Sequence, residues 1–188
     1  MIRAFVGIPL PHEAAEVLEG AQAGIPAGRI VPYDNFHVTI AFLGEQPRPV
    51  LEDVHHALDG VRVPAFPLSI EGLGMFGGGR PRVLFAEVAP EPELSQLRRK
   101  VLRAVHEAGI ELGRERFHPH VTLARFGDGL CGEDAAEMQA FVARQIGLRA
   151  GPFAVESFAL YRSHLGRAGP TYEVLAEYPL RFPAGTAD

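Results

Sequence analysis

Two segments of this chain carry nearly the same short motif. Residues 36–44 read FHVTIAFLG and residues 117–127 read FHPHVTLARFG, so His-Val-Thr, an aliphatic residue and Ala recur, with Gly three positions later. The alternation of apolar and polar residues in both copies predicts a β-strand. A motif written twice in a chain of 188 residues indicates an internal repeat, so the two parts of the chain are expected to fold alike.

The elements predicted around each motif follow the same order: a helix, the strand with His and Thr, a second helix and two further strands. A strand over residues 2–8 comes first. The first repeat is predicted to hold a helix from Pro11, strand 36–43, a helix from Pro49 to Gly60, and strands 66–72 and 82–88. The second is predicted to hold helix 93–108, strand 119–125, a helix near 133–146, and strands near 153–161 and 171–178.

This pattern predicts an α+β protein with a single domain over residues 1–188. We expect two pseudo-symmetric lobes, at about 9–90 and 91–180, each with a largely antiparallel sheet that faces a central cleft and with helices on its outer face. No linker rich in Ser, Gly or Pro separates the repeats, so the lobes are expected to share an interface.

Composition limits the kinds of partner that this protein is expected to bind. The net charge is −5, whereas proteins that coat nucleic acid by counterion release usually carry a basic face. A nucleic acid would therefore be met at one phosphate or one end, where a local cluster of arginines could act. Cys131 is the only cysteine, and no apolar run approaches the roughly 20 residues of a membrane span. We expect a cytoplasmic monomer without membrane contact.

Side chains two apart on a strand share a face. His37, Thr39 and Ala41 are therefore expected on one face, with Val38, Ile40 and Phe42 on the core face. The second copy places His120, Thr122 and Ala124 together in the same way. If both faces line one cleft, two imidazoles and two hydroxyls surround a common point.

This set of groups suits displacement at phosphorus. One neutral histidine can take a proton from the attacking oxygen, while a protonated one gives a proton to the leaving oxygen. Threonine hydroxyls can donate hydrogen bonds to phosphate oxygens, and a guanidinium can bind phosphate through two parallel bonds. Arg125 is the candidate cation, although strict alternation would place it on the core face. Phe42 stands at the matching position of the first copy.

The two motifs HVTIAFLG and HVTLARFG resemble the paired motifs of the two-histidine (2H) phosphoesterases. IRAFVGIPLP, RPRVLFAEV and LYRSHLGRAGPTYEVLAEYPL are similar to segments of the branch of RNA 2′,3′-cyclic phosphodiesterases, also called LigT-like or 2′-5′ RNA ligase-like. The resemblance covers nearly the whole chain. It implies hydrolysis of an RNA 2′,3′-cyclic phosphate end, or of a small nucleoside cyclic phosphate, to a 2′-phosphate without metal or other cofactor.

By motif position, the resemblance implies that His37 is the proton donor and His120 the proton acceptor. Thr39, Thr122 and Arg125 would bind the phosphate. No motif identifies residues that stack on the nucleoside. Phe5, Phe76 and Tyr161 are candidates that could equally belong to the core.

Three alternatives stay open. The same two histidines could run a transesterification backwards and join 2′-5′ linked RNA ends. An ATP-dependent ligase with a lysyl intermediate is disfavoured, because Lys100, the only lysine, lies in an ordinary amphipathic helix. His118 and His120 could bind a metal, but no carboxylate or cysteine stands nearby at ligand spacing. A non-catalytic module that binds phosphate ends would not need the histidines.

Overall fold

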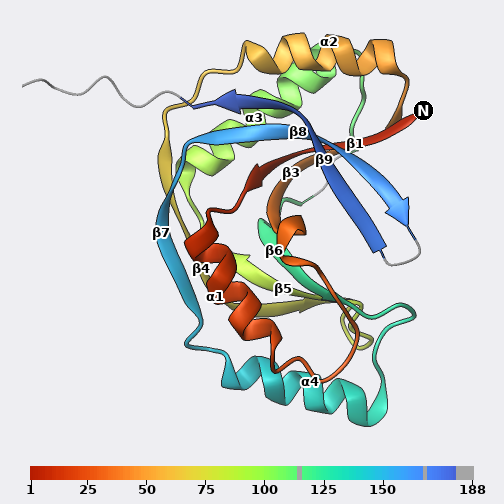
Figure 1. Cartoon of the computed structure of the whole chain (residues 1–188), viewed down its shortest axis with the longest axis vertical. Coiled ribbons are helices and arrows are strands. Elements are labelled where there is room, and N and C mark those ends of the chain that lie inside the picture. Colours follow the sequence, from red (N-terminus) through yellow and green to blue (C-terminus); the bar gives the residue numbers. More distant parts are fainter. Residues whose placement is uncertain (114–115, 167–168, 181–188) are drawn as a thin grey trace, which may run out of the picture.

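The structure is a computed structural model that describes residues 1–113, 116–166 and 169–180. Helices and strands in this part of the chain alternate much as the sequence predicts (Figure 1). The helices are α1 (His12–Gln22), α2 (Arg48–Asp59), α3 (Pro92–Glu107), α4 (Gly132–Arg144) and the short 3-10 helix η1 (Tyr33–Asn35). The strands are β1 (Ile2–Pro9), β2 (Arg29–Ile30), β3 (His37–Gln46), β4 (Phe66–Phe76), β5 (Val83–Val88), β6 (His120–Arg125), β7 (Arg149–Val155), β8 (Ser157–Gly166) and β9 (Gly169–Pro179).

Proline and glycine set the helix boundaries. Pro11 and Pro47 are extended residues directly before α1 and α2, where a missing backbone N–H costs nothing. Gly60 follows the last turn of α2, and its N–H donates to the carbonyls of Ala57 and Leu58. The prediction is wrong at 153–161, which forms two strands with Glu156 between them, and it missed β2 and η1.

The strands form one sheet in the order β7-β4-β5-β6-β3-β1-β8-β9, with β2 paired to β6, and every pair is antiparallel. The α+β class and the antiparallel pairing are confirmed. The expectation of two separate sheets is corrected, because Val38 on β3 pairs with Val121 on β6 and joins the two halves. This junction lies inside both His-Thr motifs.

Each half of the sheet draws on both sequence repeats. The hairpin of β4 and β5 comes from the first repeat but pairs with β6 of the second, while β8 and β9 of the second repeat extend from β1. The break at Glu156 is where the chain passes from one half, in β7, to the other, in β8. Strand pairs therefore join residues from both sides of the predicted boundary between the repeats, near residue 90. The division into lobes at 9–90 and 91–180 describes the repeat in the sequence and stays a proposal.

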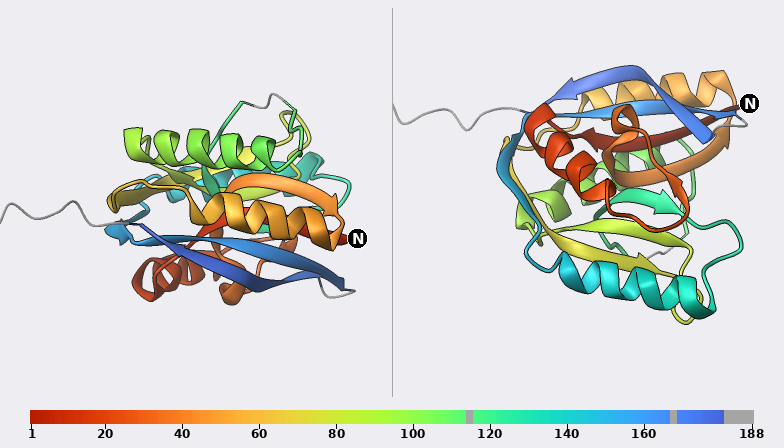
Figure 2. Two further views of the ribbon diagram at one scale, coloured as in Figure 1. Left: turned by 90° about the horizontal axis from the view of Figure 1, so that it is seen from above. Right: turned by 60° about the horizontal axis from the view of Figure 1, so that its bottom comes forward.

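One hydrophobic core runs through both halves. Its members include Val6, Leu84, Val121 and Leu160, each at most 2% exposed. Helices α2 and α3 pack against each other, α1 packs beside β7, and α4 contacts β4. Figure 2 shows α1 and α3 on opposite sides of the strands. In the described part of the chain, no helix combines the length and the apolar character needed to span a membrane.

Candidate active site

The two His-Thr motifs lie side by side on neighbouring antiparallel strands. Because Val38 pairs with Val121, the register places His37 opposite Thr122 and Thr39 opposite His120. Both valines are fully buried, so the four polar side chains share the other face of the sheet. The two histidines are diagonal neighbours, which are typically about 7–8 Å apart. The structure thus brings these four predicted residues together.

A β-bulge at the same place in both motifs explains how Arg125 reaches this face. The register of β6 against β5 shifts after Thr122, so that Leu123 and Ala124 are both fully buried and Arg125 is half-buried. The extra residue reverses the alternation. The expectation that Ala124 shares the polar face is therefore wrong. Arg125, which strict alternation would place on the core face, lies beside His37 and Thr122.

The bulge in β3 follows Thr39 and has the same effect. Ala41, expected on the polar face, is buried, whereas Phe42, expected in the core, is 59% exposed. Phe42 thus stands in the first motif where Arg125 stands in the second. The orientations of Phe42 and Arg125 could not be predicted from the sequence, because the pattern of apolar residues does not indicate a β-bulge.

Backbone carbonyls orient both imidazole rings in the same way. Nδ1 of His37 lies 2.7 Å from the carbonyl oxygen of Asn35, and Nδ1 of His120 lies 2.7 Å from that of His118. A carbonyl only accepts hydrogen bonds, so each Nδ1 carries the proton and each Nε2 is left to act as acid or base. Nε2 of His37 lies 3.0 Å from the hydroxyl of Thr39, which donates to the neutral ring.

Aromatic side chains surround both histidines. The ring centres of Phe5 and Tyr172 lie 4.6 and 5.0 Å from the ring centre of His37. Those of Phe76 and Phe85 lie 4.9 and 5.2 Å from the ring centre of His120. These apolar surfaces exclude water and disfavour a charged imidazole.

Burial is accordingly the main cause of two shifted pKa values. It lowers the pKa of His37 to about 4, with the hydrogen bond to the Asn35 carbonyl opposing and the charges of His120 and Arg125 reinforcing the change. Burial also lowers the pKa of His120, and again Arg125 contributes. Both rings are therefore neutral at pH 7 in the free protein. The positive charge of Arg125 thus acts on both histidines.

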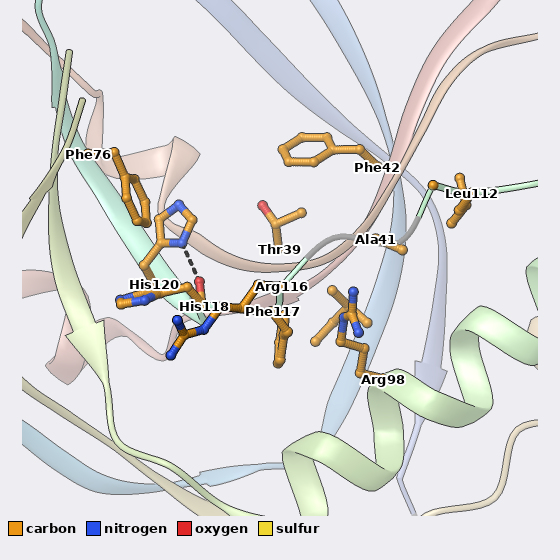
Figure 3. Close-up of a pocket in the computed structure, with 12 residues that line it drawn as sticks. Thr39, Ala41, Phe42, Phe76, Arg98, Leu112, Arg116, Phe117, His118 and His120 are labelled. Atoms are coloured by element: carbon orange, nitrogen blue, oxygen red, sulfur yellow. Dashed lines mark hydrogen bonds between the residues drawn. The ribbon is translucent and has the colours of Figure 1, made fainter. Parts of the chain in front are cut away.

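Two hollows open on either side of the four motif residues. His120 and Thr39 line a pocket of about 250 Å³, and His37 and Thr122 line a smaller one of about 20 Å³ with Arg125. Figure 3 shows His120 and Phe76 on one side of the larger pocket and Thr39 and Phe42 on the other.

Arg98 and Phe117, which are not among the predicted site residues, extend the larger pocket. Arg98 reaches it from α3, with its guanidinium carbon 4.5 Å from the centre of the Phe117 ring (Figure 3). Its Nε is buried without a hydrogen-bond partner among the described residues. The segment LRRK looks like an ordinary helix in sequence, so only the tertiary arrangement could reveal this position.

The three candidates for nucleoside stacking differ in how accessible their rings are. Phe5 and Tyr161 are 2% and 7% exposed and stack on each other behind His37, with ring centres 4.9 Å apart. They belong to the packing of the site. Phe76 instead lies half-buried in the wall of the larger pocket, where a bound group could reach it.

His118 and His120 were considered as ligands of a metal ion. The ring centres are 6.4 Å apart, and Nε2 of His118 lies 3.2 Å from a carboxylate oxygen of Glu87. In the described parts of the chain, no group of three or more His, Cys, Asp or Glu side chains is arranged to hold a metal ion. The expectation of a metal-free site therefore stays a prediction.

Comparison with known proteins gives a consistent relationship. The family model of the 2′-5′ RNA ligase superfamily matches residues 9–167. The RNA 2′,3′-cyclic phosphodiesterase of Thermus thermophilus is 34% identical, with 96% of this chain and 91% of that protein aligned, and the Escherichia coli protein of the same name is 31% identical, with 95% and 96% aligned. The chain spans 56% of the Geobacillus stearothermophilus relative of that name, at 32% identity over 94% of this chain.

Solved structures agree with this relationship. The crystal structure of E. coli LigT superimposes with a TM-score of 0.78 at 28% identity and covers 96% of this chain and 98% of LigT. The crystal structure of a T. thermophilus protein superimposes with a TM-score of 0.78 at 31% identity, with 96% and 99% covered. With the matched sequence, fold and paired motifs together, this chain belongs to the 2′-5′ RNA ligase superfamily.

Proposed function

We propose that this protein hydrolyses RNA ends that carry a 2′,3′-cyclic phosphate and leaves a 2′-phosphomonoester. The observation that carries the proposal is the pairing of the two motif strands. It supports a site where both histidines and both threonines act on one face of the sheet, with each Nδ1 bonded to a backbone carbonyl. Relatives with the name RNA 2′,3′-cyclic phosphodiesterase, aligned over most of both chains, support the same activity.

In this mechanism, water attacks phosphorus and the bond from phosphorus to O3′ breaks. Nε2 of His120 accepts a proton from the water, and Nε2 of His37 gives a proton to O3′, so the ring opens to the 2′-phosphate. Thr39, Thr122 and Arg125 donate hydrogen bonds to the non-bridging oxygens. Each proton transfer contributes about 10²–10⁴ in rate.

The donor role of His37 requires a proton that the free protein does not hold at pH 7, because burial lowers the pKa to about 4. An anion bound between the histidines favours their charged forms and raises their pKa values. The negative charge of the substrate thus supplies the condition for protonation of His37. The assignment of donor and acceptor rests on the resemblance of the motifs.

The test uses adenosine 2′,3′-cyclic phosphate in the presence of a strong chelator, with the product identified by ³¹P NMR. We expect 2′-AMP. H37Q and H120Q should each lower kcat by about 10²–10⁴, and each should remove one limb of a bell-shaped pH profile. H106Q, at an exposed position on α3, is the matched control and should keep full activity.

Other outcomes would favour the alternatives. Loss of activity in chelator alone would indicate a metal site. Full activity in both H37Q and H120Q would exclude the two-histidine mechanism, and tight binding of the substrate without any product would favour a non-catalytic phosphate-end module.

The family name also favours a second candidate activity, the joining of RNA ends through a 2′-5′ linkage. In this reaction a 5′-hydroxyl takes the place of water, attacks phosphorus and expels O3′, so the ring opens to a 2′-5′ diester. The same two histidines would serve, with His120 accepting the proton of the hydroxyl and His37 giving a proton to O3′. Incubation of two oligonucleotides, one with a cyclic phosphate end and one with a free 5′-hydroxyl, would reveal a longer product.

We also propose that the protein acts in the cytoplasm as a monomer. The single Cys131 supports the location, since a reducing compartment has no use for an intrachain disulfide. Sedimentation analysis of the purified protein would test the oligomeric state.

A further inference from the structure

Two arginines face each other directly beside the phosphate position. Arg29 on β2 and Arg125 on β6 are partners in the antiparallel ladder, so their side chains leave the sheet on the same side. Both line the small pocket of His37 and Thr122, and both line an adjoining pocket of about 350 Å³ that Arg3 also reaches. One face therefore carries three guanidinium groups around two connected hollows.

This arrangement is unfavourable in the absence of an anion. Like charges directly opposite each other in a sheet destabilise it, and Asp and Glu outnumber Lys and Arg by 23 to 18 in the chain. Yet no Asp or Glu is among the described residues that line either pocket. Within the same part of the chain, none of these three arginines forms an ion pair.

The position of Arg29 is well defined by its surroundings. Its guanidinium lies against Gly169 at the start of β9, where a Cβ would be 3.7 Å from the guanidinium carbon. Gly169 and Pro170 line the same small pocket. Arg3 is less decisive, because Glu45 is its cross-strand partner. Arg29 is therefore the clearer of the two candidates for binding an anion.

Arg125 already has a role at the reacting phosphate in the proposed function, so its neighbour Arg29 is placed for a different anion. In an RNA strand, the nearest other anion is the phosphate on the 5′ side of the terminal nucleotide. Guanidinium groups bind phosphate oxygens through paired hydrogen bonds. Phe42, which is exposed between this pocket and the larger one, offers an apolar surface to the nucleoside that joins the two phosphates.

We infer that Arg29, with support from Arg3, binds the phosphate on the 5′ side of the nucleotide whose 2′,3′-cyclic phosphate is opened. This inference rests on the proposed function and narrows its substrate. The protein should prefer a terminal nucleotide with a 5′-phosphate, or one within an oligonucleotide, to a nucleoside 2′,3′-cyclic phosphate with a free 5′-hydroxyl.

The sharpest test compares two substrates that differ only in one phosphate group: adenosine 2′,3′-cyclic phosphate with and without a 5′-phosphate. We expect kcat/KM to be about tenfold higher with the 5′-phosphate, as is reasonable for one charge-assisted contact. The ratio should decrease as salt concentration rises, because the guanidinium is accessible to solvent. R29Q should bring the ratio close to one.

R48Q is the matched control. Arg48 pairs with Glu52 on the surface of α2, away from the three pockets, so this variant should retain the wild-type ratio. R98Q tests the competing position in the larger pocket.

A ratio near one in the wild type would overturn the inference while leaving the proposed function intact. So would a high ratio that persists in R29Q or that is lost in R98Q instead. Hydrolysis of neither substrate by the wild type would contradict the proposed function itself.

Discussion

At the scale of single residues, burial favours the uncharged form of two imidazoles in the free protein. Neutral imidazoles beside buried aromatic rings are tolerated in the fold, whereas a charged one would lose hydration. The hydrogen bonds from Nδ1 to backbone carbonyls leave the opposite nitrogen unprotonated, and that of His37 accepts a hydrogen bond from Thr39. Both imidazoles are thus oriented in the free protein.

This arrangement makes the stability of the free protein depend on pH through His37. Its pKa is about 4 in the folded protein and about 6.5 in an unfolded chain. As the pH falls below 6.5, the unfolded state takes up the proton first, so the free energy of unfolding decreases until the pH reaches about 4. The full decrease due to this residue is about 3 kcal/mol.

Urea unfolding at pH 7 and pH 5 would measure this effect. Carboxylates also titrate in acid, so the informative quantity is the difference between the wild type and H37Q. H37Q should lose less stability than the wild type over this interval, while H106Q should behave as the wild type does. An equal loss in H37Q would show that His37 is not buried as a neutral ring.

At the scale of secondary-structure elements, the sequence predicted most helices and strands to within a few residues. Pro, Gly and the apolar periodicity set those boundaries, so they can be recognised locally. The bulges in β3 and β6 could not be recognised, since Ile40-Ala41 and Leu123-Ala124 fit a regular strand equally well. His37, Thr39, His120 and Thr122 precede the bulges and were placed correctly, whereas Phe42 was not.

The strand β1 contributes a glycine to the packing of His37. A Cβ on Gly7 would lie 3.1 Å from the carbonyl oxygen of Val38 and 3.4 Å from Cδ2 of His37. We therefore expect G7A to displace the imidazole and to lower kcat/KM for the cyclic phosphate more than tenfold, since small misplacements of a catalytic group are costly.

Gly20 provides the matched control for this substitution. It lies in α1, and a Cβ there would meet nothing within 4 Å. G20A should therefore stabilise the protein by about 0.5–1 kcal/mol and leave kcat/KM unchanged. If G7A were as active as G20A, the space beside His37 would not matter for the reaction.

At the scale of the whole molecule, the sequence could not reveal how the repeats combine. Periodicity identifies a strand but not its partner. Across the repeat boundary, β5 pairs with β6 and β4 pairs with β7. Each motif strand therefore has the other motif strand as one neighbour: β6 lies between β5 and β3, and β3 lies between β6 and β1. As a result, the position of one histidine relative to the other depends on both halves being folded.

Such interdependence predicts that the chain unfolds as one cooperative unit. Leu84 on β5 and Leu160 on β8 lie in opposite halves of the sheet but in one continuous core, and both are almost fully buried. L84A and L160A should each lose about 2–5 kcal/mol of stability. Each should also lower the midpoint of the same single calorimetric transition, with equal calorimetric and van't Hoff enthalpies. If either variant split the transition into two, the halves would be independent folding units, and the alignment of the two histidines would depend on docking instead of on a shared core.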